Sequence, residues 1–118
     1  MSVICLGEAL FDLLANQPGV PLAQVTAWTA YPGGAPTNVA CGLAKLGTKI
    51  ALISCLGGDS ISINIVELLT KAKVNLTGLQ YHPTAPTRQI YVTRSLAGDR
   101  TFAGFINDLS SDQFADAY

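Results

Sequence analysis

Charged residues are scarce in this chain. Only 13% of its 118 residues are Asp, Glu, Lys or Arg, whereas about 25% is typical of a soluble domain. The net charge is −1 and the basic residues do not cluster, which argues against nucleic acid or an anionic membrane surface as a partner. A surface so poor in charge predicts that another molecule covers much of it, or that part of the molecule is missing.

Long apolar runs, targeting signals and metal-binding motifs are absent as well. No apolar stretch approaches the roughly 20 residues of a membrane span, and the N-terminus lacks the basic start and small-residue cleavage site of a secretion signal. The three cysteines, Cys5, Cys41 and Cys55, do not have the spacing of metal ligands. We expect three buried thiols in a reducing compartment, the cytoplasm. The sole histidine, His82, stands in a loop before a proline and receives no role.

The residues that are present form the pattern of a globular α/β domain. The chain is 49% hydrophobic, and its length suits one small domain. Continuous apolar runs over 3–6 and 50–56 predict strands that are buried on both faces. Apolar stripes predict helices over 35–46 and 61–72, and residues 16–32 are expected to form a hairpin or flap off the main sheet. This order of elements implies a parallel sheet.

The second half of the chain adds strands and one uncertain terminal element. Further strands are expected over 76–81, 87–95 and 101–105, the last two as a hairpin. Ser110 and Gln113 have the spacing of a capping box, so a third helix should begin near residue 111. Only two turns of that helix would fit before the chain stops, which makes the last element look interrupted.

One hexapeptide, Gly33-Gly34-Ala35-Pro36-Thr37-Asn38, carries most of the functional information. Glycine allows a bound molecule to approach the backbone because no Cβ stands in the way. Pro36 would lie in the first turn of a helix, where proline is well tolerated. Asn38 would project from the same turn with both a donor and an acceptor, which suits a polyhydroxylated ligand. The alternative is an asparagine that satisfies its own helix N-terminus.

Several motifs in this order resemble the ribokinase-like (PfkB-type) carbohydrate kinases, and within them the fructokinase group. The matching pieces are Gly7-Glu8-Ala9-Leu10-Phe11-Asp12, Gly33 to Ala40, Leu43 to Gly47, Gly57-Gly58-Asp59, Pro86-Thr87-Arg88-Gln89 and Gly98-Asp99-Arg100 with Phe102. The resemblance implies a parallel sheet flanked by helices with a small β lid. Residues 1–118 would be the N-terminal part of one kinase domain, hence incomplete, with lid strands at about 13–31 and 88–105.

The same resemblance implies where a sugar, fructose or a related one, would bind. The six positions are Asp12, Gly33, Gly34, Asn38, Arg88 and Gln89. For Asp12 the alternative is a turn or capping carboxylate at a strand end. Which of Arg88 and Gln89 faces the sugar depends on the strand register. Glu8 would orient Asp12 or a neighbour, or else would be a surface or capping carboxylate.

The family transfers the γ-phosphate of ATP, with Mg²⁺, to a sugar hydroxyl. Its catalytic aspartate lies in a Gly-Ala-Gly-Asp-like motif of the C-terminal half, which this chain does not reach. We therefore expect an N-terminal fragment with the sugar-binding half of the site, no catalytic residue, no metal site and few of the ATP-binding residues. Gly57-Gly58-Asp59 imitates the missing motif, but we expect Asp59 to cap the second helix.

Two other functions compete with this interpretation. A non-catalytic sugar-binding or dimerising module is the first, because lids of this family frequently pair between subunits and a homodimer could form in that way. A dinucleotide-binding dehydrogenase half is the second, and it needs Gly-x-Gly-x-x-Gly directly after the first strand. Residues 7–12 do not supply that pattern.

The chain departs from the family pattern around its second helix. Relatives usually have Phe-Gly where this chain has Ile61 and Ser62, and they tend to have glycine at the position of Lys73. A lysine in a left-handed helix cap should cost about 1 kcal/mol. These departures lie away from the expected sugar-binding residues.

Overall fold

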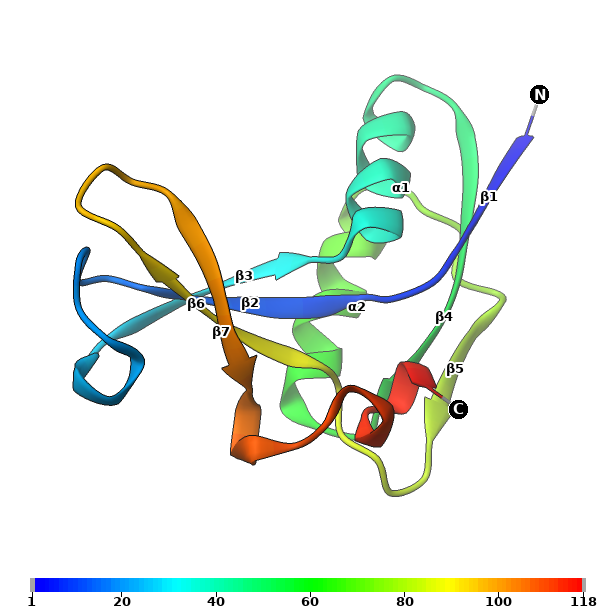
Figure 1. Ribbon diagram of the computed structural model, residues 1–118. Coiled ribbons are helices and arrows are strands. Elements are labelled where there is room, and N and C mark those ends of the chain that lie inside the picture. The colour runs from blue at the N-terminus through cyan, green and yellow to red at the C-terminus, as the bar shows by residue number, and fades with distance from the viewer. Residues whose placement is uncertain (1, 118) are drawn as a thin grey trace.

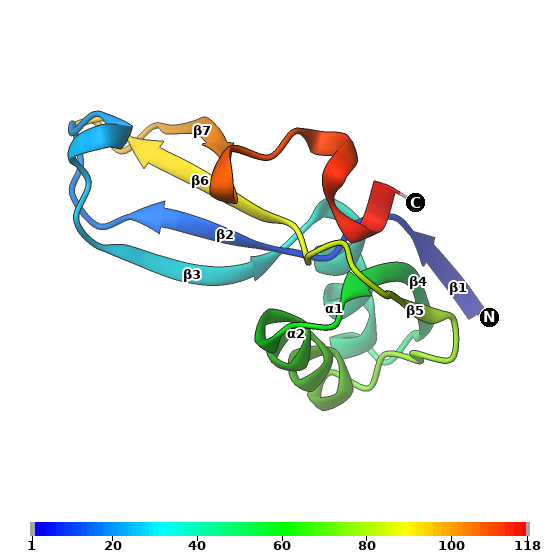
Figure 2. The same ribbon diagram turned by 90° about the horizontal axis from the view of Figure 1, so that it is seen from below.

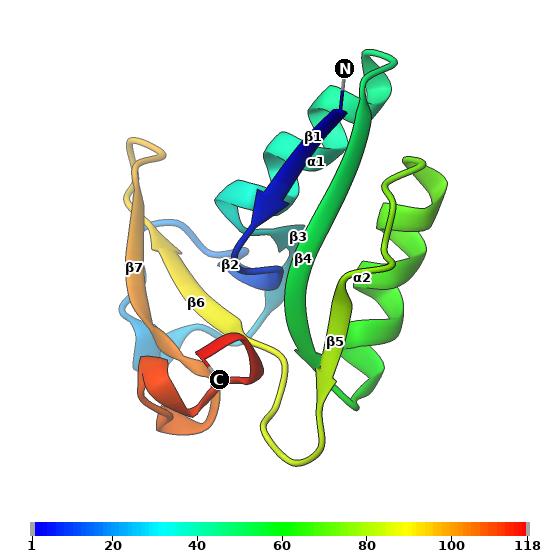
Figure 3. The ribbon, with the colours of Figure 1, turned by 90° about the vertical axis from the view of Figure 1, so that its right-hand side faces the viewer.

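The computed structural model describes residues 2–117, which form two sheets (Figure 1). The first sheet is parallel, with the order β1-β4-β5, and consists of β1 (Ser2–Leu6), β4 (Lys49–Gly57) and β5 (Leu79–His82). Two helices, α1 (Ala35–Lys45) and α2 (Ser60–Lys71), lie together on one face of this sheet (Figure 3). The predicted α/β architecture with a parallel sheet is therefore confirmed.

The second sheet, which we call the lid, extends to one side of the first (Figure 2). Its order is β3-β2-β6-β7, and its strands are β2 (Leu10–Ala15), β3 (Trp28–Gly33), β6 (Gln89–Arg94) and β7 (Arg100–Phe105). β2 pairs antiparallel with β3 and parallel with β6, and β6 and β7 form an antiparallel hairpin. The radius of gyration is 15.0 Å, against about 13.5 Å for a compact domain of this length, as a projecting lid requires.

The hydrophobic core lies between β4 and the two helices. Alternate residues of β4 are buried, among them Leu52 and Leu56. They pack with Ala40 of α1 and with Ile65 and Leu69 of α2, all of which are fully buried. The spacing of the helical residues matches one face of a 3.6-residue repeat, so the apolar stripe and the buried face coincide.

Both helices end in the same hydrogen-bonded cap. After α1, Gly47 has φ 87° and its N–H donates to the Ala44 carbonyl. After α2, Lys73 has φ 65° and its N–H donates to the Thr70 carbonyl over 3.0 Å. The next N–H, that of Val74, donates to the Leu69 carbonyl over 3.1 Å, which completes a Schellman cap. Lys73 thus occupies the left-handed position that was expected for it.

The prediction of a third α-helix near residue 111 is wrong. Three short 3₁₀ segments stand there instead, at Ile106–Asp108, Ser111–Gln113 and Ala115–Ala117. One capping-box contact does form, since the Ser110 N–H donates to Gln113 Oε1 over 2.7 Å. Phe114 then becomes extended, with φ −91° and ψ 159°, and the Ala115 N–H donates to the Pro86 carbonyl over 2.9 Å. Contacts with the rest of the fold outweigh the local helix signal.

The other face of the parallel sheet is largely bare. In Figure 3 this face is toward the viewer, and the C-terminal 3₁₀ segments cover only its lower end. Ile4 and Leu6 are 66% and 74% exposed, and Ile53 and Cys55 are half-buried. The expectation that both apolar runs are buried on two faces is therefore wrong for these strands.

The three cysteines are free, and each is half-buried rather than buried as expected. Burial raises the pKa of the Cys41 and Cys55 thiols, and the carboxylate of Asp116 raises that of Cys55 further. Within residues 2–117, the structure contains no helix with the length and apolar character that a membrane crossing requires.

Candidate functional site

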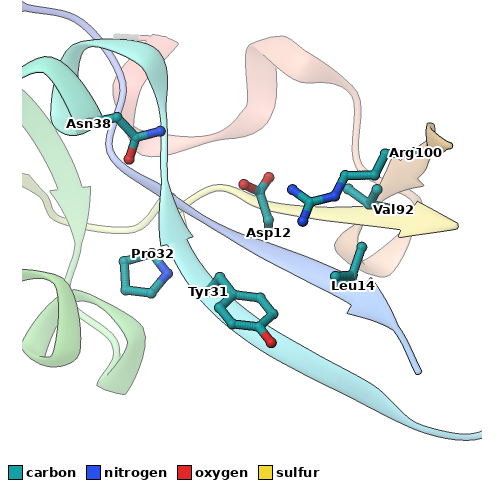
Figure 4. Close-up of a pocket in the computed structure, with 7 residues that line it drawn as sticks. All are labelled: Asp12, Leu14, Tyr31, Pro32, Asn38, Val92 and Arg100. Carbon is teal, nitrogen blue, oxygen red and sulfur yellow. The ribbon is translucent and has the colours of Figure 1, made fainter. Parts of the chain in front are cut away.

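A cavity of about 440 Å³ opens where the lid meets the N-terminus of α1 (Figure 4). Its lining comes from all four lid strands and from α1: Asp12, Leu14, Tyr31, Pro32, Asn38, Val92 and Arg100. Apolar and hydrogen-bonding groups are mixed in this lining, as in sites for small polar molecules. Two of the expected sugar-binding residues, Asp12 and Asn38, are therefore brought together from positions 26 apart in the chain.

Asp12 lies on the central part of β2, opposite Tyr31 of β3 and beside Ile90 of β6. Its carboxylate faces the cavity in Figure 4, and it makes no hydrogen bond with any residue in the range 2–117. Burial raises the pKa of this carboxyl group, while the positive charge of Arg100 acts in the opposite direction. The cavity thus contains a half-buried carboxylate whose acceptor capacity is unused.

Gly33 and Gly34 are needed for contacts inside the protein. A Cβ on Gly33 would stand 2.5 Å from Asp12 Oδ2, and one on Gly34 would stand 2.5 Å from the Glu8 carbonyl oxygen. Gly34 also has φ 100°, which favours glycine. The same Glu8 carbonyl accepts a hydrogen bond of 2.9 Å from Thr37 Oγ1. Gly33 therefore leaves room for the Asp12 carboxylate, and Gly34 lets the end of β3 pass close to the β1–β2 connection.

Asn38 lies in the first turn of α1. Its backbone N–H donates to the Gly34 carbonyl over 2.9 Å, so the helix N-terminus does not rely on its side chain. The amide is directed toward the cavity in Figure 4 and has no hydrogen bond to the described residues. The alternative in which this side chain caps its own helix does not occur.

The structure does not bring Arg88 and Gln89 to this cavity. The register pairs Gln89 with Phe11 and Ile90 with Asp12. Because side chains alternate along a strand, Gln89 lies on the lid face opposite to Asp12. Arg88 precedes β6 on the same side as Asp12, but its side chain is committed elsewhere.

Arg88 is only 6% exposed and holds the C-terminal segment against the base of the lid. Its Nε donates to Asp116 Oδ2 over 2.9 Å, and its two terminal nitrogens donate to the hydroxyl and the carbonyl of Ser111 over 2.9 and 2.7 Å. Glu8, which was expected to orient Asp12 or to lie on the surface, has its Oε2 3.7 Å from Arg88 Nε. The contacts of Arg88 with Asp116, Ser111 and Glu8 therefore stabilise the fold and hold its guanidinium outside the cavity.

Two lining residues, Tyr31 and Arg100, were not singled out from the sequence. Tyr31 faces the site because it stands opposite Asp12 in the β2–β3 register. Arg100 belongs to the Gly98-Asp99-Arg100 motif, but only the pairing of β7 with β6 places its side chain over the cavity. Both residues could have been identified from the pairing register of the strands, but a single sequence does not reveal that register.

The Gly57-Gly58-Asp59 turn does not fit ATP and Mg²⁺. Asp59 caps α2 as predicted, since its Oδ1 accepts from the Ser62 N–H over 3.1 Å. The same carboxylate also accepts from the Thr87 N–H over 2.9 Å and from the Thr87 hydroxyl over 2.7 Å. Three protein donors therefore occupy most of the acceptor capacity of this carboxylate. Over residues 2–117, no cluster of three His, Cys, Asp or Glu side chains could hold a metal ion.

Known proteins resemble this chain in sequence and in structure. Probable fructokinase-5 of Arabidopsis thaliana is 38% identical over 105 residues, which are 89% of this chain and 32% of that protein. The fructokinase of Halothermothrix orenii matches the structure with a TM-score of 0.82 at 29% identity, over 100% of this chain and 40% of that one. Fructokinase with bound ATP from Xylella fastidiosa matches with a TM-score of 0.77 at 34% identity, over 98% and 34% of the two chains.

The relatives also show how much of a kinase is present. The chain spans about a third of the length of the curated relatives it matches. Over that span the ribokinase-like α/β fold expected from the sequence is confirmed. The family model for pfkB family carbohydrate kinases matches residues 1–117, and the chain therefore belongs to this family of carbohydrate kinases.

Proposed function

We propose that this chain forms the sugar-binding half of an ATP-dependent, fructokinase-like sugar kinase. The supporting observation is that the Asp12 carboxylate and the Asn38 amide face one cavity with their hydrogen-bonding capacity unused by residues 2–117. Asp12 is half-buried and Asn38 is exposed, and two converging side chains whose donors and acceptors are unused by the protein suit a polar ligand.

The chemistry of the cavity suits a sugar. A carboxylate accepts hydrogen bonds from adjacent hydroxyls, and an amide can donate to one hydroxyl while accepting from another. Leu14, Pro32 and Val92 offer apolar surface to the carbon-bound hydrogens of a sugar ring. In this proposal Asp12 and Asn38 bind and orient the sugar, and Gly33 and Gly34 keep the Asp12 carboxylate and the start of α1 in place.

The phosphoryl donor is the other substrate of such a kinase. Fructokinase relatives include one solved with bound ATP, so we propose ATP with Mg²⁺ for the complete family enzyme, bound mostly outside this chain. Because Asp59 is engaged by Ser62 and Thr87, the 118-residue chain on its own should not transfer phosphate. Formation of ADP in a mixture of the chain, ATP, Mg²⁺ and D-fructose would contradict this division of roles.

Sugar binding can be tested directly by isothermal titration calorimetry with D-fructose. We expect saturable binding by the 118-residue chain and a clear loss for Asp12→Asn, which removes the charged acceptor but keeps the shape. Asp99→Asn is the matched control, because it makes the same charge change at an exposed turn of the lid. The proposal fails if the unaltered chain binds no sugar, or if Asp12→Asn binds as tightly.

A second proposal concerns assembly, since we infer that two copies associate through their lid strands. β3 and β7 are the unpaired edges of the lid, and exposed aromatic side chains stand on them, Tyr31 at 51% and Phe102 at 59%. Sedimentation analysis should show a dimer that Phe102→Lys dissociates. Leu46→Lys, at an exposed residue beyond α1, should leave the dimer intact, and a monomeric unaltered chain would refute the idea.

We also propose a reducing compartment, the cytoplasm, as the place of action. Its support is the three free and partly accessible thiols, since oxidising compartments favour disulfides.

A further inference from the structure

Arg100 differs from the other two arginines of the chain in having unused donors. Arg88 donates to Asp116 and Ser111, and Arg94 donates from Nε and a terminal nitrogen to two backbone carbonyls over 2.9 and 3.0 Å. The side chain of Arg100 has no hydrogen bond or ion pair with any residue of the described range 2–117. Its five N–H donors are therefore available to another molecule.

The guanidinium of Arg100 is directed at the Asp12 carboxylate from across the cavity (Figure 4). Asp12 lies on β2 and Arg100 on β7, with β6 between them, so the two strands run about 10 Å apart, and the register offsets the two residues along the strands as well. The two charged groups are not within the 4.0 Å that defines an ion pair in this structure. The positive charge of Arg100 nevertheless reaches Asp12, because it opposes the rise in the pKa of that carboxyl group.

This arrangement places an acceptor-only group and a donor-only group on opposite sides of one cavity. A hydroxyl both donates and accepts, so adjacent hydroxyls of one sugar can donate to Asp12 and accept from Arg100 at the same time. The pair is also neutral overall, since one negative and one positive charge face the ligand. An anionic sugar would gain from Arg100 but would be repelled by Asp12 at close range.

We propose that Arg100 is a specificity-determining residue that binds, together with Asp12, an adjacent pair of hydroxyls on a neutral sugar. The inference rests on the proposed sugar-binding function and extends it to the class of sugar. It assigns to the lid hairpin a ligand contact that none of the six positions expected from the sequence supplies.

The experiment compares the dissociation constants of D-fructose and D-gluconate for the 118-residue chain and two variants. Arg100→Gln should weaken fructose binding about tenfold or more, the usual effect of losing a hydrogen bond to a charged group. Lys49→Gln makes the same charge change at an exposed residue outside the cavity, and it should leave both constants unchanged. The unaltered chain should bind gluconate more weakly than fructose.

A second readout separates a ligand contact from a structural role. In the sugar-free chain, NMR titration should show a higher pKa for Asp12 in Arg100→Gln, because the opposing positive charge is gone, with the amide spectrum otherwise preserved. Arg100→Lys keeps the charge but loses the planar fork, so it should restore the pKa of Asp12 while fructose binding stays weakened.

Three outcomes would overturn the inference. Equal fructose affinity for Arg100→Gln and the unaltered chain would show that Arg100 does not contact the sugar, while the proposed function survives. Tighter binding of gluconate than of fructose, lost in Arg100→Gln, would make Arg100 a carboxylate receptor. An unaltered chain that binds no sugar would overturn the proposed function and this inference together.

Discussion

We expect Asp12 to lower the stability of the fold that positions it. Its carboxylate is half-buried and unbonded within the described residues, and removing a charge from water is unfavourable unless a partner compensates it. The attraction of Arg100 offsets only part of this effect, since the pKa of Asp12 remains raised. A ligand hydroxyl would supply the missing hydrogen bonds, so sugar binding and stability should rise together.

The pH dependence of this effect has a definite sign. Because the folded pKa of Asp12 lies above the ordinary value of 3.8, its contribution favours folding below that value and is lost as the pH rises through the folded pKa. Asp12→Asn removes this titration. In thermal unfolding the variant should therefore be more stable than the unaltered chain at pH 7, and the difference should vanish below pH 3.8. A less stable variant at pH 7 would contradict the assignment.

Lys73 gives a second test at the scale of single residues. A lysine at φ 65° adopts a conformation in which its Cβ is crowded, whereas glycine is not. Lys73→Gly should raise the free energy of unfolding by about 1 kcal/mol. Lys71→Gly is the control, because it places glycine inside the last turn of α2 and should lower stability by about 1 kcal/mol. Urea denaturation measures both, and the same sign for both would exclude the explanation.

Among the elements, the C-terminal 3₁₀ segments depend on one buried ion pair. The Arg88 guanidinium carbon lies 5.3 Å and 4.9 Å from the ring centres of Phe105 and Phe114, and Asp116 is bonded to its edge. Both charged side chains are only 7% exposed. The arginine thus joins the end of β7, the base of β6 and the C-terminal segment.

Removing one partner should leave a buried charge without compensation. Asp116→Ala is therefore expected to lower the free energy of unfolding by about 3–5 kcal/mol, measured by urea denaturation. Asp112→Ala, at an exposed residue of the neighbouring 3₁₀ segment, should cost less than about 1 kcal/mol. Similar small losses for the two variants would mean that the pair does not hold this segment.

The same elements show what a sequence can predict and what it cannot. The two helices and the strands of the parallel sheet follow from apolar periodicity, which is local. The placement of Asp12 and Asn38 in one cavity could be predicted, because both belong to motifs that resemble those of the family. Tyr31 and Arg100 could not, because their places depend on the pairing of strands. The prediction of a C-terminal helix was wrong because the local capping signal competes with the tertiary contacts of Phe114 and Ala115. Those contacts cannot be inferred from a local sequence pattern.

The molecule as a whole presents an apolar sheet face to solvent. Ile4 and Leu6 stand exposed on β1, and β1 is also an edge with a partner on one side only. Faces and edges of this kind promote association. The 118-residue chain should therefore enhance the fluorescence of a hydrophobic dye, and Leu6→Glu should reduce the signal. Leu46→Glu, equally apolar and exposed but at the end of α1, is the control, and equal reductions would locate the dye elsewhere.

The connections between the two sheets have a consequence for motion. The chain passes from the parallel sheet to the lid and back at residues 7–9, 33–34 and 83–88. The first two crossings are in close contact through the Glu8 carbonyl, and Thr87 fixes the third to Asp59 and to the Gly57 N–H. A hinge needs a few residues whose torsion angles are free to change. The contacts just described restrain the torsion angles at these three crossings. Within the lid and its connections, amide exchange should accordingly be slowest at the crossings and fastest at the far tip, and we expect any motion of the lid to be a bending along its strands.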